Sequence, residues 1–124
     1  MSEEDVADLF RPVLAVASRR MFGGLGIYDG GCMFALMTGG ELFMKADAGT
    51  RVTFETAGSS PFVYAGGAGP VTTSYWRLPP AAFDDEGEFR RWTALARDAA
   101  IRAASRPTRR RRSRPSARPD DLRG

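Results

Sequence analysis

Apolar residues near the N-terminus recur at i, i+3, i+4 and i+7, the spacing of one helix face: Val6, Leu9, Phe10 and Val13. Ser2 precedes them as the N-cap, and acidic residues follow it in the first turn. Pro12 lacks the N–H that a regular helix would donate. The pattern therefore predicts a helix over 3–13 that ends or kinks near Pro12, followed by an extended segment over 16–22.

Glycine pairs divide the next apolar stretch into short runs. Gly30-Gly31 separates LGIY from CMFAL, and Gly39-Gly40 separates MFALM from ELFMK. Two such residues between apolar runs are a hairpin signal. The pairs predict an antiparallel meander with strands over 25–29, 32–37 and 41–45.

Residues 47–57 predict a short helix with Asp47 as its N-cap and Gly58 at the C-cap position. FVYAG (62–66) and VTTSYWRLP (71–79) predict two further strands, the second ended by Pro79-Pro80. With the meander, these segments make an antiparallel sheet of about five strands.

The amphipathic pattern is clearest in the last helix, which Asp84 or Asp85 caps and which ends near Ala104. Its apolar stripe consists of Phe89, Trp92, Leu95, Ala96, Ala99 and Ala103. The predicted fold class is α+β, with the antiparallel sheet flanked by N-terminal and C-terminal helices.

Charge divides the 124 residues into a folded part and a tail. Residues 1–104 carry 10 Lys and Arg against 13 Asp and Glu, whereas residues 105–124 carry 8 Arg and 2 Asp. The second segment has one leucine as its only large apolar residue, so it cannot offset the entropy lost on ordering. We therefore expect one α+β domain over 1–104 and a disordered Arg-rich tail over 105–124. With no charged-then-apolar leader and no long apolar run, we expect a cytoplasmic protein without membrane contact.

The stretch RRMFGGLGIYDGGCMFAL (residues 19–36) invites comparison with phosphate-binding loops. No glycine in the chain is followed by Lys and then Ser or Thr, as a P-loop requires. A dinucleotide fingerprint that starts at Gly24 fails at its sixth position, which is Asp29. We therefore interpret Gly23, Gly24 and Gly26 as residues that permit a tight bend or bulge where backbones approach closely.

Catalytic side chains are scarce in the sequence. The chain has no histidine, which removes histidine-based triads, dyads and metal sites. The single cysteine, Cys32, alternates with Phe34 and Leu36 and is expected to face the core. Acid pairs at 84–88 are explained by helix capping. The sequence predicts no catalytic, cofactor-binding or metal-ligating residue and no cofactor, and hence no enzyme.

Two binding candidates remain. If their strands are neighbours, Lys45, Tyr75 and Arg77 form a polar, aromatic face for an anion or an acidic partner group, or for a small ligand or substrate; the alternative is a solvated sheet face. Arg109, Arg110, Arg111 and Arg112 suit weak, non-specific contact with nucleic acid; the alternative is a solvated tail, because the chain uses 17 Arg and one Lys. We assign Phe62, Tyr64 and Trp76 to the core.

The motifs RRMFGG-x-GIY, MFAL, ELFMKAD, F…AGSSPFVY and VTTSYWRLP, followed by an acid-capped helix, span about 19–104. In this order they resemble the N-terminal domain of the TfoX/Sxy family of competence regulators. The resemblance implies a compact α+β domain, here a stand-alone one, with a regulatory role. Full-length family members are linked to the activation of DNA-uptake genes together with a cyclic-AMP-responsive activator. They carry a helical C-terminal domain where this chain has its Arg-rich tail.

Together these observations favour a non-enzymatic domain that works through protein contacts in transcription control, with the transcription machinery or an activator as partner. The alternatives are an accessory nucleic-acid binder through the tail, and a small-ligand binder or enzyme that uses the face of Lys45, Tyr75 and Arg77. An exposed edge of the sheet could also support dimerisation, although the sequence does not locate that edge.

Overall fold

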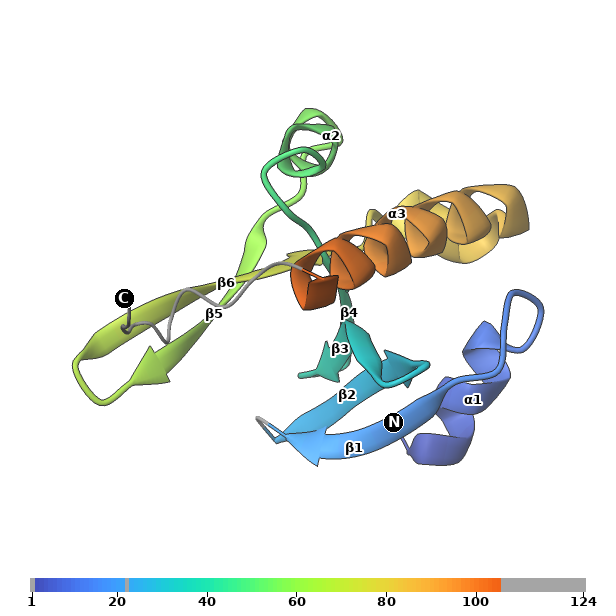
Figure 1. Ribbon diagram of the computed structural model, residues 1–124, viewed down its shortest axis with the longest axis horizontal. Coiled ribbons are helices and arrows are strands. Elements are labelled where there is room, and N and C mark those ends of the chain that lie inside the picture. Colours follow the sequence, from blue (N-terminus) through green and yellow to red (C-terminus); the bar gives the residue numbers. More distant parts are fainter. Residues whose placement is uncertain (1, 22, 106–124) are drawn as a thin grey trace, which may run out of the picture.

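The structure, a computed structural model, describes residues 2–21 and 23–105. Its elements are, in order, α1 (Glu3–Phe10), β1 (Ala17–Met21), β2 (Gly24–Asp29), β3 (Cys32–Thr38), β4 (Glu41–Lys45), α2 (Arg51–Thr56), β5 (Pro61–Gly66), β6 (Gly69–Arg77), the 3-10 helix η1 (Pro80–Asp84) and α3 (Glu86–Ser105). The strands form one antiparallel sheet in the order β1-β2-β3-β4-β6-β5 (Figure 1). The α+β prediction is confirmed, with six strands where about five were expected. The additional strand is β1, which lies within the segment predicted to be extended.

Helix α1 starts as its sequence predicts and ends earlier. The hydroxyl of Ser2 accepts a hydrogen bond from the backbone N–H of Asp5, and the Asp5 side chain accepts one from the N–H of Ser2. This capping box satisfies two N–H groups that the helix cannot pair itself. The helix ends at Phe10 rather than residue 13, because Pro12 cannot continue its hydrogen bonds.

The glycine turns of the meander adopt the backbone that hairpins require. Gly30 and Gly31 have φ of 59° and 85°, and Gly39 and Gly40 have φ of 60° and 76°. Positive φ at both central residues matches the right-handed twist of the flanking strands. Gly24 serves a different purpose, because a Cβ there would overlap the backbone carbonyl of Met37 on β3. The predicted close approach of backbones is confirmed at Gly24, and Gly23, with φ of 73°, lies in the predicted bend, whereas a Cβ at Gly26 would meet methionine side chains rather than backbone.

Helix α2 is shorter than predicted, and its N-cap is Thr50 rather than Asp47. Asp47 instead organises the turn before the helix, since its Oδ1 accepts hydrogen bonds from the N–H groups of Gly49 and Thr50, each at 3.1 Å. At the other end, Gly58 has φ of 80° and donates to the carbonyl of Glu55. Gly58 thus closes the C-terminus of α2, at the position predicted.

Helix α3 begins beside Asp85, whose Oδ1 accepts a hydrogen bond from the N–H of Glu88 at 3.1 Å. The predicted stripe is buried at Phe89, Trp92, Ala96 and Ala99. Leu95 is only half-buried and Ala103 is exposed, while Thr93 and Ala100 are buried. Residues 101–105 are all exposed, so the buried stripe of α3 ends at Ala100.

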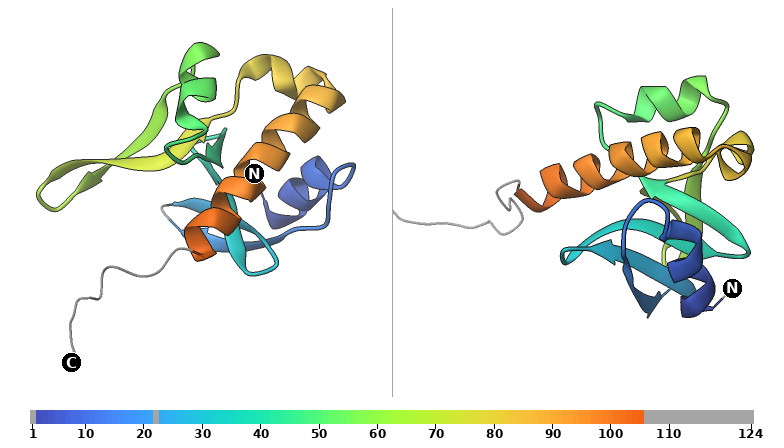
Figure 2. Two further views of the ribbon diagram at one scale, coloured as in Figure 1. Left: turned by 45° about the horizontal axis from the view of Figure 1, so that its top comes forward. Right: turned by 90° about the vertical axis from the view of Figure 1, so that its right-hand side faces the viewer.

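All three α-helices contribute to one hydrophobic core on one face of the sheet. Its aromatic members meet directly: the ring of Phe10 lies 5.4 Å from that of Phe34 and 5.1 Å from that of Phe89. The ring of Phe54 lies 4.7 Å from Trp92 and 6.2 Å from Trp76. The core thereby joins α1, α2 and α3 to β3 and β6 (Figure 2).

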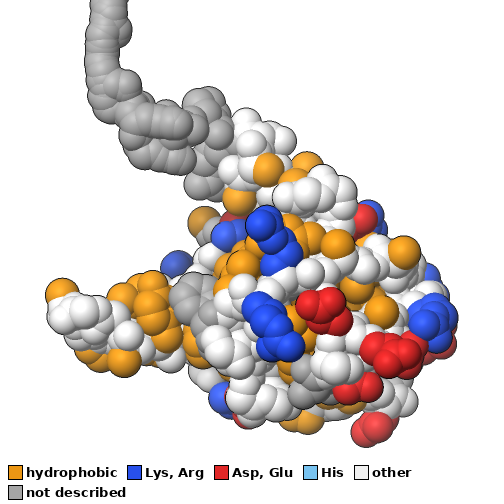
Figure 3. Space-filling model, turned by 90° about the horizontal axis from the view of Figure 1, so that it is seen from below, with side chains coloured by type: hydrophobic (Ala, Val, Ile, Leu, Met, Phe, Trp, Pro, Cys, Tyr) orange, Lys and Arg blue, Asp and Glu red, His pale blue; other side chains and the backbone are white. Residues whose placement is uncertain are grey.

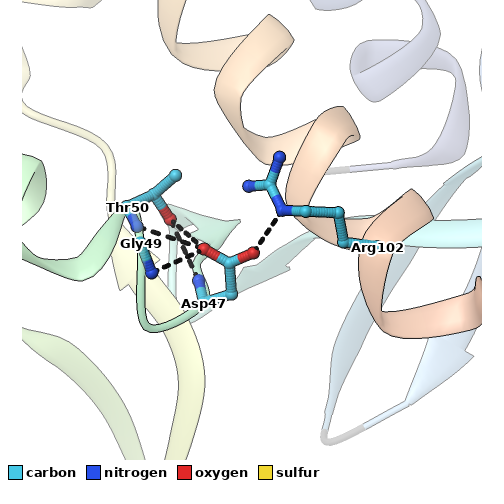
Figure 4. Close-up of polar contacts among 4 residues, drawn as sticks. All are labelled: Asp47, Gly49, Thr50 and Arg102. Carbon is cyan, nitrogen blue, oxygen red and sulfur yellow. Dashed lines mark hydrogen bonds and ion pairs between the residues drawn. The ribbon is translucent and has the colours of Figure 1, made fainter. Parts of the chain in front are cut away.

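An ion pair connects the turn before α2 to the last turns of α3. The Nε of Arg102 donates to Oδ2 of Asp47 at 2.6 Å (Figure 4). The Asp47 side chain is only 12% exposed. The hydrogen bond from Arg102 lowers the pKa of Asp47, because it stabilises the charged form.

We predict that Gly24→Ala destabilises the domain by at least about 2 kcal/mol, because the added methyl must displace backbone rather than a flexible side chain. Gly67→Ala is the matched control, since a Cβ at Gly67 meets no atom within 4 Å. Denaturant unfolding of both variants measures the difference. Equal stabilities would refute the close approach of β2 and β3.

We also predict that Asp47→Asn lowers the midpoint of thermal unfolding at pH 7. A carboxyl whose pKa is lowered by folding contributes stability above its unfolded pKa, and loses it as the pH falls through the folded value. The difference between variant and parent should therefore shrink below about pH 4. Glu55→Gln is the control, because its ion pair with Arg51 spans 3.9 Å between exposed side chains and should contribute little. A difference that persists unchanged in acid would contradict this account.

Candidate functional site

Strands β4 and β6 lie side by side in the sheet, although α2 and β5 separate them in sequence. Lys45 is opposite Tyr75, and Phe43 is opposite Arg77. The sequence predicts that Lys45, Tyr75 and Arg77 share one face of the sheet if their strands are neighbours. The structure meets that condition and brings the three residues together.

Lys45 is held against the neighbouring strand. Its Nζ lies 5.2 Å from the centre of the Tyr75 ring, within the range of a cation–π contact. The same Nζ donates a hydrogen bond to Oγ of Ser74 at 2.6 Å. These contacts fix the ammonium group over an aromatic ring.

Arg77 makes the same kind of contact two residues further along β6, where it is opposite Phe43. Its Cζ lies 5.9 Å from the centre of the Phe43 ring, and its Nη2 donates to Oε1 of Glu41 at 3.1 Å. Phe43 is only 4% exposed, and its ring is also 5.1 Å from that of Phe62 on β5. The guanidinium group thus covers a packed aromatic pair.

Tyr75 lies half-buried beneath this surface. Its hydroxyl donates to the backbone carbonyl of Met33 at 3.3 Å. Burial raises the pKa of the phenol to about 12, with a smaller contribution from Tyr28. At neutral pH Tyr75 is therefore a hydrogen-bond donor with an aromatic ring, and not a base.

The same side of the sheet continues across to β1. Arg19 is opposite Gly26, Gly26 is opposite Leu36, and Leu36 is opposite Phe43, so these positions form one cross-strand row that ends at Arg77. Cζ of Arg19 lies 5.8 Å from the centre of the Tyr28 ring. We call this side of the sheet, which lies opposite the helix-packed core, the open face. It is defined by Arg19, Tyr28, Phe43, Lys45, Tyr75 and Arg77.

Chemically, the open face combines fixed positive charge with aromatic rings on rigid strands. Its six defining residues include three cations and no acid, and Glu41 stands beside Arg77. Such a surface can attract carboxylates, and the partly exposed rings of Tyr28 and Tyr75 can contact apolar groups, whereas Phe43 is buried. Among residues 2–21 and 23–105, no group of three Cys, Asp or Glu side chains is placed to hold a metal ion.

The described residues of the glycine-rich stretch, 19–21 and 23–36, lie in β1, β2, β3 and the turns between them, and none of them starts a helix. A Cβ at Gly26 would come within 2.9 Å of the sulfur of Met21 and 3.1 Å of the sulfur of Met33. Gly26 therefore lets two methionine side chains close over the middle of the open face. The sequence identified the need for small residues here, but not that methionines fill the space.

The other sequence candidates have mixed outcomes. Trp76 belongs to the core as predicted, whereas Phe62 and Tyr64 are half-buried outside it. The prediction for these two residues was wrong because alternation along β5 turns them to the side of Phe43.

Cys32 is a free cysteine that packs partly buried against the core. Ser105, the first residue of the predicted disordered tail, is instead the last residue of α3, and the rest of the tail, including Arg109–Arg112, lies outside the described residues.

Two features of the helix side were not predicted. An ion pair joins Asp29, at the end of β2, to Arg97 of α3 at 2.6 Å. A shallow groove of about 370 Å³ runs between the turn before α2 and β6, lined by residues that include Arg51, Thr72 and Trp76. No sequence motif marks either one, because both join segments far apart in the chain.

None of the helices in the described part of the chain is long and apolar enough to cross a membrane. No curated protein matches the chain. The family model for the TfoX N-terminal domain matches residues 8–100, which include every strand and most of α3. The chain therefore belongs to the TfoX N-terminal domain family.

Proposed function

We propose that this domain is a non-enzymatic regulatory module that acts by binding a protein partner, in the control of transcription. The observation that carries the proposal is the open face, a pre-formed surface of paired cations and rings in a TfoX N-terminal domain. The partner is a component of the transcription machinery or an activator protein.

The open face has the properties of a recognition surface. Its cations are held over rings by strand geometry, so little conformational entropy remains to be lost when a partner binds. Aromatic residues and arginine are also the types that contribute most to protein interfaces. Residues 1–104 as a whole carry more acidic than basic groups, which makes the local excess of cations distinctive. We therefore expect the partner to present acidic and apolar side chains.

Charge reversal tests this proposal. Arg19→Glu combined with Lys45→Glu should abolish capture of purified RNA polymerase or an activator protein by the immobilised chain, because repulsion replaces attraction at two places on the face. Arg51→Glu is the control, since Arg51 lies on α2 and is not part of the open face. Thermal unfolding checks that all variants fold. Capture that survives the double reversal, or no capture by the parent chain, would refute the proposal.

Nucleic-acid binding through the tail is a second candidate, favoured by the 8 Arg within residues 105–124. Replacing Arg109–Arg112 with alanine should then weaken binding to duplex DNA in a gel-shift assay. It should also reduce the dependence of log K on log salt by about 0.9 for each lost phosphate contact. Replacing Arg19, Arg51, Arg90 and Arg91 removes the same charge elsewhere and serves as the control. Equal affinity and equal salt dependence for the two variants would exclude a specific role for the tail.

A further inference from the structure

The sheet has two edge strands, β1 and β5, and they differ sharply in charge. β1 carries Arg19 and Arg20. Charged residues on an edge strand discourage pairing with another chain, because like charges on the paired strands would lie side by side and repel. β5 (Pro61–Gly66) carries no charged residue, and its one proline stands at its first position. Only β1 is protected in this way.

The lack of charge extends over the β5–β6 hairpin as far as Trp76. The sequence contains no Asp, Glu, Lys or Arg between Glu55 and Arg77, although 27% of the chain is charged. Figure 3 shows the result on the surface: charged side chains gather over the body, while the hairpin that projects to the left is hydrophobic or neutral. Val63 and Val71 are 47% and 38% exposed on this hairpin.

The outer part of the hairpin is a two-stranded ribbon. β4 pairs with β6 only at residues 75–77, so within residues 2–21 and 23–105 the pairs from Val63–Thr72 to Gly66–Gly69 have no third strand beside them (Figure 1). Two-stranded ribbons are only marginally stable in water. A third strand added beside the β5–β6 ribbon would stabilise it. The outer side of β6 is a poor place for it because Pro70 lacks an N–H, whereas in the edge strand β5 the single proline, Pro61, stands at the first position.

We propose that β5 is a dimerisation edge that pairs antiparallel with β5 of a second copy of this chain. A two-fold axis brings identical residues together, so a charged edge would repel itself and a neutral one would not. The described body carries an excess of acidic groups, and the neutral hairpin is where two such bodies can meet without repulsion. The protected β1 edge stops the pairing from extending into a fibre.

The dimer has a definite geometry. Antiparallel pairing in a continuous sheet places the two-fold axis perpendicular to that sheet, so the open faces of both copies lie on the same side. Exposed Val63 and Ala65 alternate with half-buried Phe62 and Tyr64, and each pair packs against its counterpart in the second copy. This inference is independent of the proposed function, because it uses none of the open-face cations.

Sedimentation velocity across a dilution series of the full chain tests the proposal. The parent should be a dimer that dissociates on dilution. Val63→Lys should raise the dissociation constant at least about tenfold, since the two introduced charges lie close to the two-fold axis. Val52→Lys is the matched control, because Val52 is 60% exposed on α2 and should leave the dimer intact.

Ala65→Lys, also at an exposed position of β5, should act as Val63→Lys does. Equal midpoints of thermal unfolding in the monomeric state show that the variants fold. A parent that stays monomeric throughout the series would overturn the proposal, as would a dimer that tolerates both β5 substitutions. Neither result bears on partner capture by the open face, which has its own charge-reversal test.

Discussion

The antiparallel pairing of β4 with β6 is the constraint on which the rest of this domain depends. It joins two strands separated by α2 and β5, and only residues 75–77 of β6 take part. On one side of the pair, Met44 and Trp76 enter the core beneath α2 and α3. On the other side, the same register sets Lys45 against Tyr75 and Arg77 against Phe43. One short pairing therefore serves both the stability of the fold and the assembly of the open face.

Local structure could be predicted well from the sequence because short-range physics determines it. The Ser2 cap, the paired glycines and the Gly58 terminator each act within a few residues, and each lies where it was expected. The predicted face of Lys45, Tyr75 and Arg77 also formed, since alternation along a strand sets which residues share a side. Its formation still depended on a strand order that local patterns do not encode.

The features that sequence reasoning missed are those that depend on distant contacts. Asp47 has the chemistry of an N-cap, yet it stabilises the preceding turn and pairs with Arg102 from the far end of the domain. Phe62 and Tyr64 are of residue types common in cores, but the alternation of side chains along β5 places them with Phe43 on the side of the sheet opposite the core. The strand order, with β6 between β4 and β5, was equally out of reach, because no local signal specifies which strands become neighbours.

The strand order gives the surface three regions of different physical character: a cationic aromatic face, a charged edge at β1 and a neutral edge at β5.

The central claim is that the open face is a packed surface and not a loose set of solvated side chains. The most direct test follows the NMR chemical shift of the Tyr75 ring carbon that bears the hydroxyl while the pH is raised, because burial raises the pKa of this phenol to about 12. The account predicts that the Tyr75 signal stays unshifted through pH 10.5. An ionisation near pH 10, the ordinary range for an exposed tyrosine, would contradict it.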